Sequence, residues 1–126
     1  MSNIPANLKY TKDHEWALQD GETVTIGITD FAQGSLGDLV YVELPAIGRQ
    51  VKKGEACVIV ESCKAASDVY APISGEIIEV NNAVVATPET INQNPYEGGW
   101  LMKIKPSNAA ELAELIDSNS YSAIAA

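Results

Sequence analysis

Residues 61–76 read ESCKAASDVYAPISGE and lie between two runs of residues that favour β-strands. Cys57 to Val60 leads into this stretch, and Val69 to Ala71 is the second run. Strand-forming residues on both sides of a short run of small residues predict two strands joined by a tight reversal. The reversal would carry Lys64 outward at its tip, beside a pair of alanines.

Other stretches of the chain also favour strands. Thr23–Ile28 alternates polar and apolar residues, which is the period of a half-buried strand. The dipeptide Asp20-Gly21 before it suits a type I′ hairpin turn. Many short strands at this spacing predict a closed or sandwiched antiparallel sheet. We predict strands at His14–Gln19, Thr23–Ile28, Leu39–Glu43, Ala56–Ser62, Asp68–Ala71, Gly75–Val80 and Trp100–Lys105.

Helix is the minor component. Asp30 with Gln33 resembles a capping box, and Gly37 can end the short helix that follows. Asn108 with Glu111 is a second such start, which predicts a C-terminal helix. This helix would pack on the sheet as a lid or, alternatively, bind a partner. Its apolar residues on one face are Leu112, Leu115 and Ile116.

Length and charge exclude several classes of protein. The 126 residues suit one domain, and 46% apolar content is enough for a folded core. Seventeen acidic against eight basic residues leave a net charge of −9, which argues against nucleic acid or an anionic membrane as partner. The longest apolar run, Ala56–Val60, is too short to span a bilayer. Met1–Lys12 lacks the features of a signal or transit peptide, so we expect a cytoplasmic protein.

Two cysteines and one histidine limit the chemistry. Cys57 and Cys63 form no CxxC pair, so a closed zinc site is not expected. We expect both to be buried, reduced thiols that share one face of a strand, although a mixed disulfide with a nearby disulfide is an alternative. His14 is the only histidine, which leaves one possible base for a nucleophilic mechanism. We therefore predict neither a metal site nor catalytic residues.

Lys64 differs from the other lysines in its sequence context. Lys52 and Lys53 are typical of solvated surface charges, and Lys64 can be one too. At the tip of a hairpin, however, a lysine with small neighbours can enter the active site of a modifying enzyme. Its long stem then becomes the root of a tether.

Residues 61–76 resemble the lipoylation segment of the glycine cleavage system H-protein family. Residues 8–10 with 14–16, 26–30, 42–45 and 94–100 resemble further signatures of that family in the same order. The resemblance implies a mainly β, lipoyl-domain-like barrel-sandwich hybrid with short peripheral helices and a C-terminal helix. We expect a single domain over 1–126, with a lipoyl-like core at about 22–105 and a helical segment at about 108–126.

The resemblance also implies a cofactor and a set of partners. Lipoate would be attached to Lys64 as N6-lipoyllysine, which changes the net charge from −9 to −10. The arm would accept the aminomethyl group of glycine from a pyridoxal phosphate-dependent glycine decarboxylase and present it to a tetrahydrofolate-dependent aminomethyltransferase. Dihydrolipoyl dehydrogenase, with FAD, would reoxidise the arm, and a lipoate-attaching enzyme would load it. The chain would be a monomeric carrier rather than an enzyme.

Three further residues are candidate contacts for the arm. The family motifs place acidic contacts for the loaded amine at Glu15 and Asp68, although these residues can instead be a solvated strand residue and a brace of the turn. Some family members have histidines after Thr29-Asp30, where this chain has Phe31 and Ser35. Ser35 is a weaker substitute for such a contact.

Three other functions compete with the carrier of glycine cleavage. An H-like protein can chiefly relay lipoate to other enzymes. A biotin carboxyl carrier uses a similar fold and lysine, but methionines usually flank that lysine, where this chain has Cys63 and Ala65. A thiol redox enzyme would use Cys57 and Cys63. The mass of the group added at Lys64 distinguishes a lipoyl carrier from a biotin carrier.

Overall fold

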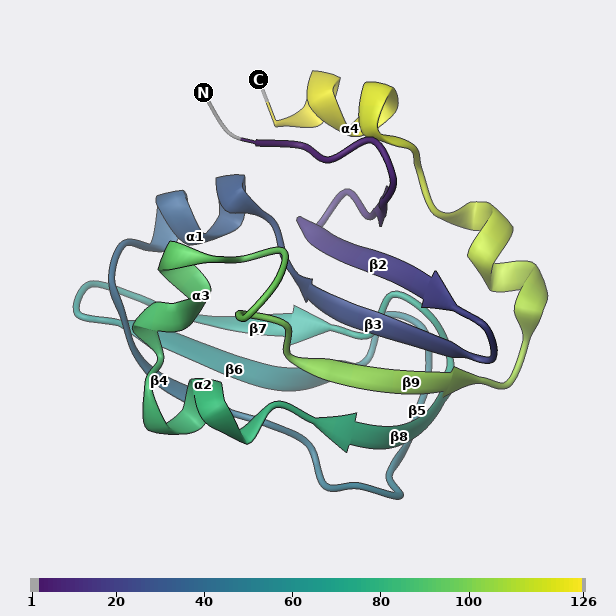
Figure 1. The fold of residues 1–126 in the computed structure, drawn as a ribbon, viewed down its shortest axis with the longest axis horizontal. Helices are drawn as coiled ribbons and strands as arrows, with labels where there is room; N and C mark the ends of the chain where they lie inside the picture. Colours follow the sequence, from purple (N-terminus) through teal and green to yellow (C-terminus); the bar gives the residue numbers. More distant parts are fainter. Residues whose placement is uncertain (1–2, 126) are drawn as a thin grey trace.

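The computed structural model describes residues 3–125, so Met1, Ser2 and Ala126 of the expected domain lie outside the described residues. The strands form two antiparallel sheets whose buried sides share one core (Figure 1). The larger sheet has the spatial order β1 (Lys9–Tyr10), β2 (Glu15–Asp20), β3 (Thr23–Ile28), β9 (Met102–Pro106), β8 (Gly75–Val80) and β5 (Gln50–Val51). The smaller sheet has the order β4 (Leu39–Glu43), β6 (Ala56–Ser62) and β7 (Ala66–Tyr70).

Most of the predicted strands are confirmed. The bounds of β3, β4, β6 and β8 are those predicted, and those of β2, β7 and β9 differ by one or two residues. Strands β1 and β5 were not predicted, because two residues each are too few to show alternation. The mainly β interpretation therefore holds.

The hairpin turn between β2 and β3 is present, but it is not of the predicted type I′. Asp20 pairs with Thr23, so the two central residues are Gly21 and Glu22. A type I′ turn needs positive φ at both central residues, but only Gly21, at 61°, has it. A glycine at the first central position with positive φ is the pattern of a type II′ turn.

Helix α1 (Asp30–Leu36) begins one residue earlier than the predicted capping box implies. The N-cap is Thr29, whose side-chain oxygen accepts a hydrogen bond from the Ala32 amide at 3.2 Å. Asp30 instead lies in the first turn and accepts from Gln33 Nε2 at 2.6 Å. Gly37, at φ 85°, ends the helix as predicted.

The prediction of one continuous C-terminal helix is wrong. Asn108 does cap a helix, but this is a short 3₁₀ helix, η1 (Ala109–Glu114), and a separate helix α4 (Ser118–Ile124) follows. Between them Ile116 pairs with Tyr10 of β1 through hydrogen bonds of 2.8 and 2.9 Å. This pairing needs extended backbone, so the helix is interrupted. Two further helices that were not predicted, α2 (Asn82–Ala86) and α3 (Glu89–Gln93), precede β9.

A small aromatic cluster fastens α4 to the larger sheet. Tyr121 is the one described residue of α4 that is buried, and its ring stacks on Tyr10 with centroids 4.6 Å apart. Its hydroxyl lies 2.6 Å from Thr29 Oγ1 and 2.7 Å from His14 Nδ1. The only histidine therefore anchors a helix, and burial lowers its pKa.

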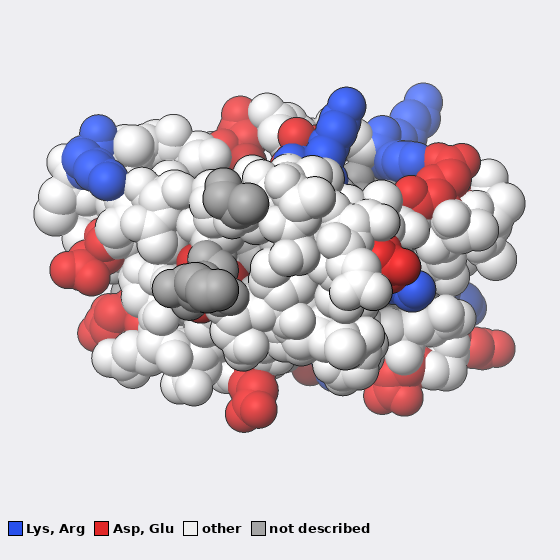
Figure 2. Space-filling view, turned by 90° about the horizontal axis from the view of Figure 1, so that it is seen from above, with Lys and Arg blue, Asp and Glu red and all other residues white. Residues whose placement is uncertain are grey.

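Figure 2 shows one face of the molecule, with uncharged side chains across its middle and most of the basic side chains in view along its upper edge. Within residues 3–125 no helix is long and apolar enough to cross a membrane. The same residues contain no cluster of three His, Cys, Asp or Glu side chains that could hold a metal ion.

Candidate functional site

Lys64 lies at the middle of the three-residue turn between β6 and β7, and the whole turn is exposed. Ser62, the last residue of β6, holds this turn together. Its side-chain oxygen accepts from the amides of Lys64 at 3.3 Å and Ala65 at 3.2 Å, and its own amide donates to the Ala65 carbonyl at 2.8 Å. Sequence analysis missed Ser62, although a serine beside a predicted turn is a recognised signal.

The stem of Lys64 lies over the C-terminal end of α1. A Cβ atom built on Gly37 would be 3.5 Å from Lys64 Cε and 4.0 Å from Nζ. None of the ion pairs among the described residues includes Lys64. Lys64 is exposed, and no carboxylate of residues 3–125 forms an ion pair with its amine.

These surroundings fit a long acyl group in amide linkage to Lys64. The residues that follow, Ala65 and Ala66, are small and exposed, and Gly37 has no side chain to obstruct the stem. An amide at Nζ would remove the charge of the lysine, and no ion pair of the described residues would be lost with it.

Glu15 is a buried carboxylate, with 3% of its surface exposed. Thr11 Oγ1 donates to Glu15 Oε1 at 2.7 Å, and the Tyr70 amide donates to Oε2 at 3.4 Å. Burial raises the pKa of Glu15 to about 7, and these two hydrogen bonds oppose the rise. The described ion pairs do not include Glu15, so its negative charge is uncompensated. Thr11 was not predicted to belong to the site.

Glu15 lines a pocket of about 270 Å³ at the end of β7 that is remote from Lys64. Tyr70 and Pro72 form part of the wall, and Leu115 and Ile124 contribute apolar side chains from the C-terminal segment. The four residue steps of β7 measure roughly 13 Å. The four-carbon stem of a lysine is too short to cover this length.

The other two predicted contacts lie elsewhere. Asp68 is exposed on β7 and lines a separate hollow of about 140 Å³ with Arg49 and Cys57. Ser35 is exposed on α1, two residues before Gly37. The structure thus brings the end of α1 to Lys64 and places Glu15 in a pocket that neither Asp68 nor Ser35 lines.

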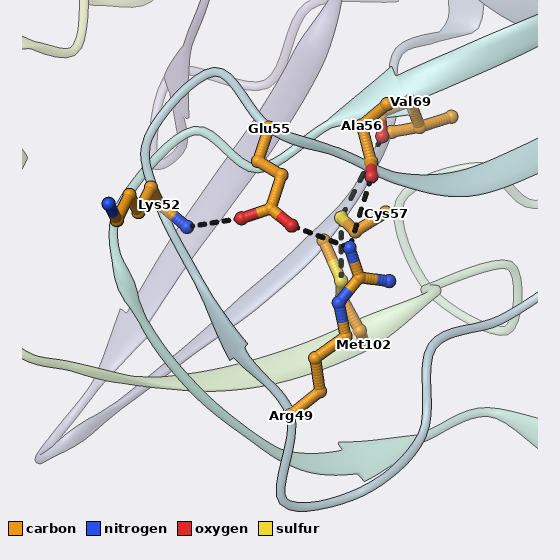
Figure 3. Close-up of polar contacts among 7 residues, drawn as sticks. All are labelled: Arg49, Lys52, Glu55, Ala56, Cys57, Val69 and Met102. Carbon is orange, nitrogen blue, oxygen red and sulfur yellow. Dashed lines mark hydrogen bonds and ion pairs between the residues drawn. The ribbon is translucent and has the colours of Figure 1, made fainter.

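The expectation of two buried cysteines on one face is wrong for Cys63. Cys57 is buried in β6, with its sulfur 3.7 Å from both the Val69 carbonyl and the Met102 sulfur (Figure 3). Burial raises the pKa of the Cys57 thiol to about 12. Cys63 is exposed, because β6 ends at Ser62 and the strand alternation ends with it.

An ion pair between Arg49 and Glu55 lies near Cys57. Arg49 donates to Glu55 Oε2 at 2.7 Å and to the Ala56 carbonyl at 3.4 Å, and the Lys52 amide donates to Glu55 Oε1 at 3.0 Å (Figure 3). These contacts hold the loop before β6 in place. Arg49 is therefore already bound where it lines the hollow that contains Asp68.

Phe31 has a structural role. It follows Thr29-Asp30, where some members of the family that the sequence resembles have a histidine. Its ring stacks on His14, with centroids 4.7 Å apart. This contact joins α1 to the residue before β2, which has an unusual positive φ of 70°. Neither aromatic ring is among the residues that line the Glu15 pocket.

The chain is similar to known proteins over nearly its whole length. The family model for the glycine cleavage H-protein matches residues 8–126. The chain is 57% identical to a glycine cleavage system H protein of Thermus thermophilus, covering 94% of this chain and 93% of that one. It is 59% identical to the protein of that name in a Marinomonas species, covering 98% of each chain. A crystal structure of a glycine cleavage system H protein from Mycobacterium marinum superposes with a TM-score of 0.88 at 44% identity, covering 95% of this chain and 97% of that one.

These matches extend over nearly the whole chain, and the structural likeness includes both sheets. The architecture is a lipoyl-domain-like barrel-sandwich hybrid with short peripheral helices. The chain belongs to the glycine cleavage H-protein family.

Proposed function

We propose that Lys64 is the lipoyl-attachment residue and that this carrier shuttles the aminomethyl group of glycine between enzymes. The observation that carries the proposal is the exposed amine of Lys64, free of any described ion pair, at the tip of the β6–β7 turn in a chain of this family. The proposed donor is the pyridoxal phosphate-dependent glycine decarboxylase, and the acceptor is the tetrahydrofolate-dependent aminomethyltransferase. Dihydrolipoyl dehydrogenase restores the disulfide of the arm.

Loading of the arm is an acyl transfer to Lys64. The neutral Nζ attacks the carbonyl of lipoyl adenylate held by the lipoate-attaching enzyme. A C–N bond forms as the C–O bond to AMP breaks, AMP leaves, and one proton passes from nitrogen to solvent. The contribution of this chain is to present an accessible amine on a turn held by Ser62.

When attached to Lys64, the lipoyl group would supply a dithiolane as the redox-active end of the arm. The pocket around Glu15 is the proposed shelter for the charged end of the arm. A buried carboxylate with no cation partner among the described residues attracts an ammonium group strongly, because little water screens it. We propose Asp68 and Ser35 as further contacts of the arm, since both are exposed, Asp68 on β7 and Ser35 two residues before Gly37.

The remaining assignments follow from the carrier role. We propose a single, monomeric domain with its lipoyl-like core at about 22–105. Two free thiols among the described residues fit a cytoplasmic location. A carrier of this kind gains speed from tethering, because the intermediate stays attached while it moves between partners.

Intact-mass measurement tests the proposal. Protein produced in cells that make lipoic acid should carry one lipoyl group in wild type and in Lys52→Arg, an exposed lysine that serves as the matched control. Lys64→Arg should carry none and should lose glycine-cleavage activity when it is reconstituted with the partner enzymes. An unmodified wild type, or a biotinyl group at Lys64, would refute the assignment.

A further inference from the structure

Asn92 in α3 makes three hydrogen bonds to the segment that leads from α1 into β4. Its Nδ2 donates to Gln33 Oε1 and to the Gly37 carbonyl, each at 2.9 Å. Its Oδ1 accepts from the Leu39 amide, also at 2.9 Å. Both amide donors and the amide oxygen are thus used, and one side chain holds the whole connection between the two elements.

Two routes lead from Asn92 to Lys64, one with a single intermediate residue and one with two. The first passes through Gly37, over which the Lys64 stem lies. The second passes through Leu39, which pairs across β4 and β6 with Ser62, the residue whose side chain holds the Lys64 turn. The C-terminal end of α1 therefore lies beside the stem of Lys64, and the first residue of β4 pairs with the residue that holds the Lys64 turn.

We propose that Asn92 is a positioning residue for the Lys64 arm. By holding Gly37 and Leu39 in place, it keeps the surface under the lysine stem and the register of the turn ready for the modifying enzyme. Without Asn92, part of the binding free energy of that enzyme goes into ordering the turn, so fewer encounters lead to acylation. This inference rests on the proposed acylation of Lys64.

The chain contains a matched control for Asn92. Asn81, at the start of α2, also makes three hydrogen bonds: its Nδ2 donates to the carbonyls of Gly98 and Trp100, and its Oδ1 accepts from the Ala83 amide. These bonds join α2 to the loop before β9 rather than to the α1–β4 connection. Loss of either asparagine removes three partly buried hydrogen bonds. A difference in acylation rate between the two variants should therefore come from the position of Lys64 and its turn.

Kinetics of acylation test the inference. The full chain is incubated with its lipoate-attaching enzyme, lipoate and ATP well below the unfolding temperature, and kcat/KM is obtained from intact mass against time. We expect Asn92→Ala to lower kcat/KM on the order of tenfold. Asn81→Ala should stay within about twofold of wild type, although both variants lose several degrees of thermal stability.

Asn92→Asp keeps the acceptor for the Leu39 amide but loses the donors to Gly37 and Gln33. Because its second carboxylate oxygen faces the Gly37 carbonyl, it should acylate more slowly than wild type, and it replaces Asn92→Ala in the comparison if that variant does not fold. Equal rates for the Asn92 and Asn81 variants, with normal acylation of wild type, would overturn this inference alone. Failure to acylate wild type would overturn the proposed function and this inference with it.

Discussion

At the scale of single residues, Glu15 departs most from ordinary behaviour. A carboxylate with 3% exposure normally has a cation beside it, but its partners here are the Thr11 hydroxyl and the Tyr70 amide. Two neutral donors do not replace the lost hydration, so burial raises its pKa to about 7. Such a residue stores unfavourable free energy that a bound ammonium group can release.

The raised pKa predicts how stability depends on pH. A carboxyl group whose pKa is higher in the folded protein than in the unfolded chain stabilises the fold below its unfolded value, near 4.5. This stabilisation is lost as pH rises through 7. Glu15→Gln should therefore be close to wild type at pH 4 and more stable than wild type at pH 8, by about 2–3 kcal/mol.

Urea unfolding of both proteins across this pH range measures the effect. Glu22→Gln, in the exposed β2–β3 turn, is the control and should change stability by a similar small amount at every pH. A difference between Glu15→Gln and wild type that does not grow with pH would contradict an ionised, uncompensated Glu15.

At the scale of elements, close contacts between strands depend on two glycines. Gly27 of β3 pairs with Trp16 of β2, and a Cβ atom at Gly27 would lie 2.6 Å from three atoms of the indole. Gly75 of β8 faces Lys105 of β9, whose carbonyl oxygen would be 2.2 Å from a Cβ. Glycine usually weakens a strand, but here its missing side chain leaves room for an aromatic ring and for a neighbouring backbone.

Gly27→Ala should lower the free energy of unfolding by about 1–3 kcal/mol, because the buried indole cannot move without disturbing the core. Gly34→Ala is the matched control, since Gly34 lies inside α1 with nothing within 4 Å of its Cβ position. It should raise the free energy of unfolding by about 0.5–1 kcal/mol through higher helix propensity. Urea denaturation of the two variants checks both signs, and a Gly27→Ala protein as stable as Gly34→Ala would contradict the predicted clash.

At the scale of the whole molecule, the dominant property is negative charge. The net charge is −9, and acylation of Lys64 would make it −10. Partners that dock such a carrier repeatedly benefit from basic surfaces, which speed up encounter. Docking with the proposed enzymes should therefore depend on salt.

Stopped-flow association with the glycine decarboxylase, at ionic strengths from about 0.01 to 1 M, measures this dependence. The association rate should fall as the screening length shrinks from about 30 Å to about 3 Å. Circular dichroism over the same range controls for unfolding. An association rate that does not change with salt would show that charge does not steer docking.

Part of this molecule could be predicted from local pattern alone. Alternation and turn residues identified seven of the nine strands within residues 3–125, and the residues around Lys64 placed it at the tip of a turn. These are local properties, because side-chain direction in a strand and the conformations of turn residues depend on near neighbours. Cys63 was wrongly expected to be buried because the alternation of β6 was extended past the end of the strand at Ser62, whereas Cys63 lies in the exposed turn.

The rest required contacts between residues far apart in the chain. The break between η1 and α4 exists because Ile116 pairs with Tyr10, and the burial of Glu15 depends on the partners that β7 and the C-terminal segment bring to it. The sequence by itself determined a mainly β fold with a lysine at a turn, since periodicity and turn chemistry act over a few residues, and its resemblance to the H-protein family implied a carrier. Only the tertiary structure decided where the Lys64 stem lies and where a carboxyl group is buried, because desolvation and long-range pairing depend on the folded chain as a whole.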